Sequence, residues 1–190
     1  INSLIDALRA KGMNPLPLFG ASLKETETAA IIADFLLRAD VDVILNMTSF
    51  AVSDPSKMAG AASGDDQDMM RSVGPFGAVD APVFQLVLAS NQKVDWQTST
   101  AGLTARDLAM NVALPELDGR ILTRAIGFKQ PLTKDPVTHA MTTSYVAAND
   151  RAAFVADLVG RWCRLRHLPN ADKKIGFVSV SYTHLRAHET

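Results

Sequence analysis

The run Val83-Phe84-Gln85-Leu86-Val87-Leu88-Ala89 (residues 83–89), introduced by Pro82, carries the clearest structural signal in the chain. All of its side chains except that of Gln85 are apolar. A nearly continuous apolar run of this length is typical of a strand that is covered on both faces, and such strands occur mainly in parallel sheets flanked by helices. Residues 83–89 are therefore predicted to form a central strand.

Helical and strand patterns alternate on either side of this strand. Helices are expected at residues 4–12, 22–40, 103–112 and 149–168, and further strands at 14–19, 41–45 and 173–178. This alternation is typical of βα units with a parallel sheet. The predicted fold class is α/β, with parallel-sheet βα units that form part of a larger multidomain protein.

Two of the helices begin with recognisable capping signals. Ser22 is followed three residues later by Glu25, which is the spacing of a capping box. Thr104 is followed by Asp107 at the third helical position. Pro115 is expected to end the helix that begins at Thr104, because proline has no N–H for the helical hydrogen bond.

Composition limits the classes of partner. With 190 residues, 47% hydrophobic and 21% charged, the chain can bury one sizeable core. A formal net charge of −1 and the lack of a basic run argue against nucleic acid and membrane surfaces as partners. No apolar run approaches the roughly 20 residues that cross a bilayer. A lone cysteine, Cys163, makes no internal disulfide, so a cytoplasmic location is expected.

The sequences at the two ends of the chain differ from those expected of native termini. Ile1 leads directly into an amphipathic helix, so an N-terminal cut is expected. Residues 179–190 resemble translated sequencing-adapter read-through. We therefore expect residues 1–178 to be part of a larger domain and residues 179–190 to be a non-native tail. His184 and His188 have the spacing of a helical metal pair but lie in this tail. Residues 54–82 are expected to form a long loop whose only helical pattern is 68–73.

Polar residues follow several predicted strands. Ligands of parallel sheets bind beyond the carboxyl ends of the strands, which points to residues 20–22, 46–49 and 90–91. Asn46 and Ser49 are taken as candidate substrate-binding residues, and plain loop or cap roles are the alternative. The chain lacks the phosphate-loop and dinucleotide-binding motifs, so any ATP would be hydrolysed by another chain or segment.

The segment Leu114–Gly119 places two carboxylates, Glu116 and Asp118, close together in an apolar stretch. Pro115 precedes them, and Gly119 permits a tight turn directly after them. Their spacing alone fits a surface turn with Asp118 and Gly119 at its corner.

The longer string around these carboxylates, residues 102–121 (GLTARDLAMNVALPELDGRI), resembles the CobN/magnesium-chelatase H family. Further matching blocks are residues 12–19, 43–46, 50–53, 82–96 and 154–162. The resemblance extends from Ile1 to about Val178. It implies that the chain is an internal portion of a much longer chelatase subunit, inactive on its own.

The resemblance implies ATP-dependent insertion of Co²⁺ into hydrogenobyrinic acid a,c-diamide, with tetrapyrrole and metal bound by this subunit and ATP hydrolysed by separate AAA+ subunits. It assigns Glu116 as catalytic residue and metal ligand, with Asp118 as a supporting catalytic residue. Two alternatives stay open. One is a magnesium-chelatase H-type subunit that inserts Mg²⁺ into protoporphyrin IX, and the other is a non-catalytic α/β module that binds a small molecule.

Overall fold

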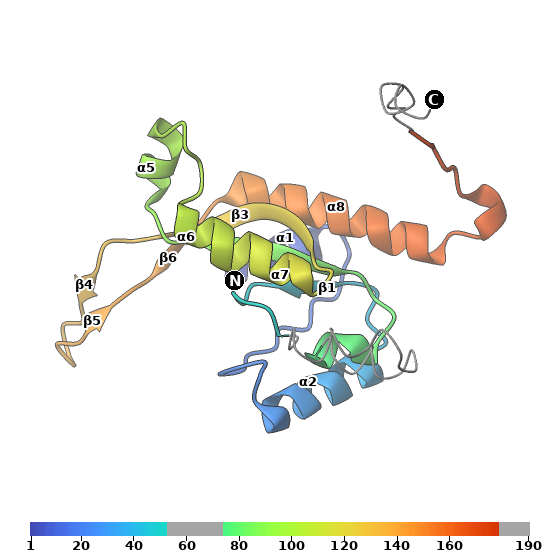
Figure 1. The fold of residues 1–190 in the computed structure, drawn as a ribbon, viewed down its shortest axis with the longest axis horizontal. Helices are drawn as coiled ribbons and strands as arrows, with labels where there is room; N and C mark the ends of the chain where they lie inside the picture. Colours follow the sequence, from blue (N-terminus) through green and yellow to red (C-terminus); the bar gives the residue numbers. More distant parts are fainter. Residues whose placement is uncertain (53–73, 179–190) are drawn as a thin grey trace, which may run out of the picture.

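A four-stranded sheet forms the centre of the fold (Figure 1). The computed structural model describes residues 1–52 and 74–178. The strand order is β1 (Ile44–Asn46), β2 (Val83–Ala89), β3 (Ile121–Lys129) and β6 (Tyr145–Ala147). β1, β2 and β3 are mutually parallel, and β6 is antiparallel to β3. The predicted α/β class with a parallel sheet is confirmed, and 83–89 is the strand expected.

One face of the sheet is covered by a helix that crosses over from β2 to β3 (Figure 1). The helix consists of α6 (Ala105–Leu108), a π-helical segment (Ala109–Ala113) and α7 (Leu114–Leu117), and is called the crossover helix below. Short helix α5 (Lys93–Thr98) precedes it. The buried side chains on this face are Val87, Ala89, Ala125, Phe128 and Ala148.

The opposite face packs against α1 (Asn2–Ala10) and α8 (Asn149–His167). Because side chains alternate between the faces of a strand, Phe84, Leu86 and Ile126 point to this side. Their helical partners in the core are Leu4, Leu8, Ala152, Val155, Ala156 and Val159. Phe84 also makes an edge-to-face contact with Trp162, with ring centroids 5.4 Å apart.

Two further parts complete the described structure. Helix α2 (Thr26–Ala39) packs against β1 and the 3₁₀ helix Gly74–Ala78 through Ile32, Leu36, Ile44 and Phe76. The hairpin of β4 (Thr133–Lys134) and β5 (Met141–Thr142) projects away from the body of the chain (Figure 1). A 3₁₀ turn, Asn170–Asp172, follows α8. None of the described helices has the length and apolar character needed to span a bilayer.

Several local expectations are wrong. Residues 14–19 form no strand, and their two prolines remove N–H donors that a strand would need. β1 is shorter than the expected 41–45. Helix α2 begins at Thr26 without a side-chain cap, because the Ser22 hydroxyl instead accepts from the backbone N–H of Lys24 at 3.2 Å.

The strand expected at 173–178 is also not formed. Phe177 and Val178 are 93% and 96% exposed, and no neighbouring strand pairs with this segment in the described residues. Most of the expected loop at 54–82, its helical pattern at 68–73 and the tail at 179–190 lie outside the described residues.

Pro115 does not end the crossover helix, which continues to Leu117. The π turn before it explains why, since the N–H of Leu114 bonds to the carbonyl of Ala109 five residues back. This wider turn changes the hydrogen-bond register just where Pro115 lacks a donor, so that the helix tolerates the ring. The expected cap of Thr104 is confirmed, because its hydroxyl accepts from the N–H of Asp107 at 3.1 Å.

The ion pair between α1 and α8 leads to a pH prediction. Lys11 lies 2.6 Å from Asp157, and this hydrogen bond, reinforced by the lysine charge, lowers the pKa of the Asp157 carboxyl. Lys11→Met should raise the pKa of Asp157 toward its ordinary value, as followed by carboxyl ¹³C NMR. Because the folded pKa is depressed, the pair stabilises the fold above the unfolded pKa and loses its effect as pH falls through the folded pKa. An unchanged titration in Lys11→Met would contradict this.

Candidate functional site

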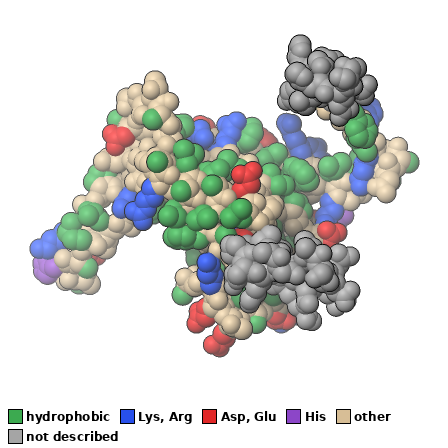
Figure 2. Space-filling view, viewed as in Figure 1, with side chains coloured by type: hydrophobic (Ala, Val, Ile, Leu, Met, Phe, Trp, Pro, Cys, Tyr) green, Lys and Arg blue, Asp and Glu red, His purple; other side chains and the backbone are tan. Residues whose placement is uncertain are grey.

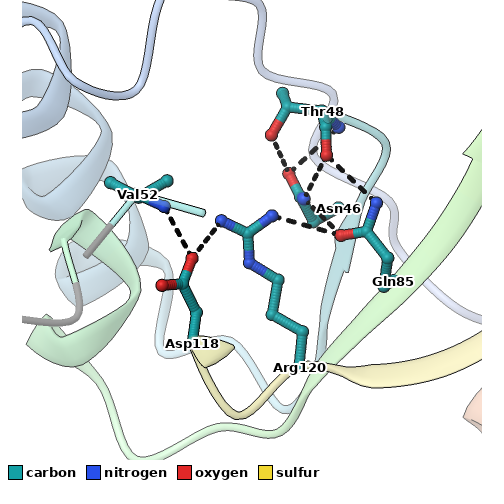
Figure 3. Close-up of polar contacts among 6 residues, drawn as sticks. All are labelled: Asn46, Thr48, Val52, Gln85, Asp118 and Arg120. Carbon is teal, nitrogen blue, oxygen red and sulfur yellow. Dashed lines mark hydrogen bonds and ion pairs between the residues drawn. The ribbon is translucent and has the colours of Figure 1, made fainter. Parts of the chain in front are cut away.

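A buried polar network connects β1, β2 and the start of β3 (Figure 3). Gln85, in the middle of β2, is 1% exposed. Its side-chain oxygen accepts from Asn46 Nδ2 at 2.7 Å and from Arg120 Nη1 at 3.2 Å. The network thus brings together residues that are far apart in the sequence.

Asp118 and Arg120 form a buried ion pair where the crossover helix turns into β3. Arg120 Nη2 donates to Asp118 Oδ2 at 2.6 Å, and the two side chains are 0% and 1% exposed. The same oxygen accepts from the backbone N–H of Val52 at 2.7 Å. Gly119, at φ +69°, supplies the left-handed residue of the turn. Asp118 therefore ties the loop after β1 to the end of the crossover helix.

Burial also affects the charge of Arg120. Desolvation lowers the pKa of its guanidinium, and the charge and hydrogen bond of Asp118 oppose that shift. The guanidinium carbon lies 5.5 Å from the centre of the Phe76 ring. Its Nε is buried without a hydrogen-bond partner among the described residues. Arg120 is consequently held between Asp118, Gln85 and an aromatic face.

Asn46 uses its side chain to shape the end of β1. Its Nδ2 donates to Gln85 Oε1 and to the Thr48 carbonyl, while its Oδ1 accepts from the N–H and hydroxyl of Thr48. Gln85 Nε2 also donates to the Thr48 carbonyl, at 3.0 Å. Both polar atoms of the Asn46 amide therefore have protein partners.

A second polar network lies nearer the start of the crossover helix. Asp107 is 2% exposed and accepts from both the backbone N–H and the hydroxyl of Ser90, at 3.0 and 2.8 Å. Asn111 donates to Asp107 at 3.3 Å and accepts from the Ser49 hydroxyl at 2.6 Å. The loops that follow β1 and β2 are thereby fastened to one helix.

Glu116 lies outside both networks. It is exposed on α7, and its carboxylate makes no hydrogen bond or ion pair with the described residues. Leu117 and Leu108 on the same helix are 54% and 48% exposed. Figure 2 shows apolar side chains gathered over this part of the surface. Glu116 is thus an accessible carboxylate on an otherwise apolar helix surface.

The described residues contain no group of three His, Cys, Asp or Glu side chains placed to hold a metal ion together. Glu116 could bind a cation only as a single carboxylate, with the other ligands supplied from elsewhere. Asp118 is already engaged with Arg120 and Val52. The described residues therefore do not supply a complete set of protein ligands for a metal ion.

The structure unites some of the sequence candidates and separates others. Asn46 and Asp118 belong to one network through Gln85 and Arg120, whereas Ser49 joins the second network. Residues 20–22 follow no strand. Roles for Asn46 and Ser49 in substrate binding, and for Glu116 and Asp118 in catalysis, stay predictions.

Sequence reasoning missed the structural importance of Gln85 and Arg120. One signal was available for Gln85, because a single polar residue inside an apolar strand must find a hydrogen-bond partner when buried. Arg120 gave no comparable signal, since a charged residue after a turn is usually exposed.

Comparison with known proteins identifies the family of the chain. Residues 1–188 match the family model described as CobN/Magnesium Chelatase. This range includes residues 179–188, which belong to the segment expected above to be a non-native tail. The boundary at Val178 stays a prediction. The aerobic cobaltochelatase subunit CobN of Sinorhizobium sp is 38% identical over 184 residues, and that of Pseudomonas aeruginosa is 39% identical over 177 residues. These alignments cover 96% and 93% of this chain but 13% of each relative.

More distant similarity extends to the magnesium branch. The chloroplastic magnesium-chelatase subunit ChlH of Oryza sativa is 26% identical over 183 residues, which is 95% of this chain and 12% of that protein. Among solved structures, the catalytic subunit of cobaltochelatase from Mycobacterium tuberculosis superposes with a TM-score of 0.67 at 33% identity. That match covers 90% of this chain and 14% of the other. The chain therefore belongs to the CobN/magnesium chelatase family and spans a small part of the length of these relatives.

Proposed function

We propose that this chain is part of the tetrapyrrole- and metal-binding subunit of a cobaltochelatase, which inserts Co²⁺ into hydrogenobyrinic acid a,c-diamide in cobalamin biosynthesis. In this proposal, separate AAA+ subunits hydrolyse the ATP. The relatives named as cobaltochelatase subunits are 38% and 39% identical to this chain, against 26% for the magnesium-chelatase subunit of rice. That difference favours cobalt over magnesium as the metal.

The observation that carries the proposal is the accessible carboxylate of Glu116 on an apolar helix surface. Metal insertion requires that water leave the cation and that protons leave the ring nitrogens. A carboxylate can bind the partly dehydrated cation through an oxygen, and it can accept a proton from a ring nitrogen. The surrounding apolar side chains suit contact with the face of a macrocycle.

Asp118 supports this role indirectly in the proposal. Its bonds to Arg120 and Val52 hold the turn that follows Glu116. Asn46 and Ser49 are proposed to contribute to substrate binding through the loop between them. Asn46 bonds to Gln85 of β2 and Ser49 bonds to Asn111 of the crossover helix, so both ends of this loop are held in place. Thr48 in that loop is exposed and available to a ligand.

The alternative reaction within the family is insertion of Mg²⁺ into protoporphyrin IX. The similarity to magnesium-chelatase subunits supports it, and the same carboxylate would serve. Competing Co²⁺ and Mg²⁺ in one insertion assay distinguishes the two reactions. A cytoplasmic location is proposed as well, in keeping with the free thiol of Cys163.

The decisive substitution is Glu116→Gln in the full-length protein, assayed with its ATPase partners. Loss of a catalytic acid or base typically costs about 10²–10⁴-fold in rate, so insertion should fall by at least about 100-fold. Tetrapyrrole binding, measured by the absorbance change of the ring, should stay the same. Glu27→Gln is the matched control, since Glu27 is an exposed glutamate on α2. Insertion at the wild-type rate in Glu116→Gln would reject the catalytic assignment.

A further inference from the structure

Two arginines lie together at the point where β3 meets the first turn of α8. Arg151 Nε donates to the carbonyl of Ala125 at 2.6 Å, and its guanidinium lies over the Trp96 ring, 4.7 Å from the centroid. Arg124 precedes Ala125 on β3, and its guanidinium stacks on Phe154 at 3.4 Å. Both side chains are half-buried. The aromatic faces and the backbone contact therefore hold the two cations in defined orientations.

Within the described residues, no carboxylate forms an ion pair with either arginine. Arg38, Arg120 and Arg166 each form an ion pair with an aspartate, whereas Arg124 and Arg151 form none. Desolvation lowers the pKa of Arg151, the charge of Arg124 lowers it further, and Asp150 opposes both effects. The charge of each arginine disfavours the charge of the other, and an anion bound between them would relieve that repulsion.

The free donors define the kind of anion. Arg151 uses only its Nε, and the side chain of Arg124 donates to none of the described residues, so the outer nitrogens of both guanidinium groups are available. A planar guanidinium matches the two oxygens of a carboxylate. Helix α8 has 19 residues and no side-chain cap at its start, so its positive end adds to the attraction.

We propose that Arg124 and Arg151 form a carboxylate-binding site that takes the acid side groups of the tetrapyrrole. This rests on the proposed function for the identity of the ligand, but the arginine geometry stands independently of it.

Residue-specific modification tests the site in the full-length protein. Phenylglyoxal reacts with arginine guanidinium groups, and peptide mass spectrometry then measures the extent at each residue. Citrate, as a simple tricarboxylate, and hydrogenobyrinic acid a,c-diamide should each slow modification of Arg124 and Arg151 several-fold. The same ring with its carboxyl groups converted to amides should not. Arg161, exposed on α8, is the internal control.

Other outcomes would overturn the proposal. Equal protection by the acid and amide forms would mean that the carboxylates are not recognised. Slow modification without any ligand would mean that an acidic residue of the full-length protein already occupies the pair. The citrate arm does not depend on tetrapyrrole binding or metal insertion, so failure of the proposed function and failure of the arginine site can be distinguished.

Binding affinity supplies the second measurement. Arg124→Gln should weaken binding of the acid form of the ring by about 10-fold, or about 1.4 kcal/mol, because a hydrogen bond between two charged groups is lost. Binding of the amide form should not change. Arg161→Gln should leave both affinities unchanged. If Arg124→Gln does not fold, the protection measured on the wild-type protein still decides the question.

Discussion

Arg120→Met is expected to lower the free energy of unfolding by about 3–5 kcal/mol, which is the usual cost of removing one partner of a buried ion pair. The substitution leaves the Asp118 carboxylate in a site where its side chain is 1% exposed. It also takes one donor from Gln85, although the bond from Asn46 persists. Methionine has a similar length, so loss of packing contributes little.

Urea denaturation followed by circular dichroism measures this effect. The double variant Asp118→Leu with Arg120→Met should recover part of the loss, because no charge is then left buried. Recovery will be incomplete, since the N–H of Val52 loses its acceptor. A single variant Arg120→Met that is as stable as the wild type would show that the pair is exposed to water in solution.

Phe84→Ala should destabilise the fold by about 3–5 kcal/mol, the range found for large aromatic side chains removed from a core. Phe84 is 1% exposed and lies between the sheet and α8, against Trp162. Its removal leaves a cavity that the backbone of a central strand cannot readily close. The edge-to-face contact with Trp162 is lost at the same time.

Thermal and urea unfolding of Phe84→Ala, with Val137→Ala as control, tests this prediction. Val137 is 85% exposed in the hairpin loop, so its truncation should change the free energy of unfolding by less than about 0.5 kcal/mol. Similar stabilities for the two variants would mean that the packing of α8 on the sheet contributes little to the fold. Quenching of Trp162 fluorescence offers a local measure of the same contact.

The elements predicted correctly are those with a strong local pattern. Residues 83–89 form β2 because their apolar run suits a strand covered on both faces, and α8 forms where the amphipathic pattern is longest. Phe154 and Leu165 of α8 are apolar, yet they are 42% and 45% exposed. The buried positions are instead Ala152, Val155, Ala156 and Val159.

The wrongly predicted helix boundaries have a common cause, because a short sequence motif is compatible with several backbone conformations. Ser22 and Glu25 have capping-box spacing, but the Ser22 hydroxyl serves a local turn. Pro115 usually ends a helix, yet a π turn allowed this one to continue. Strand β3 was not predicted at all, although its parallel pairing with β2 makes it central to the sheet. Pairing of that kind depends on residues distant in sequence.

Local pattern was sufficient to identify the α/β class, the central strand and the chelatase resemblance around Glu116, because periodicity and short motifs are properties of neighbouring residues. It could not distinguish the environments of Glu116 and Asp118, which are two residues apart. The fold separates them: Asp118 is buried against Arg120 and Val52, whereas Glu116 is exposed. The reason is physical, since the burial of a side chain depends on which distant strands and loops pack around it.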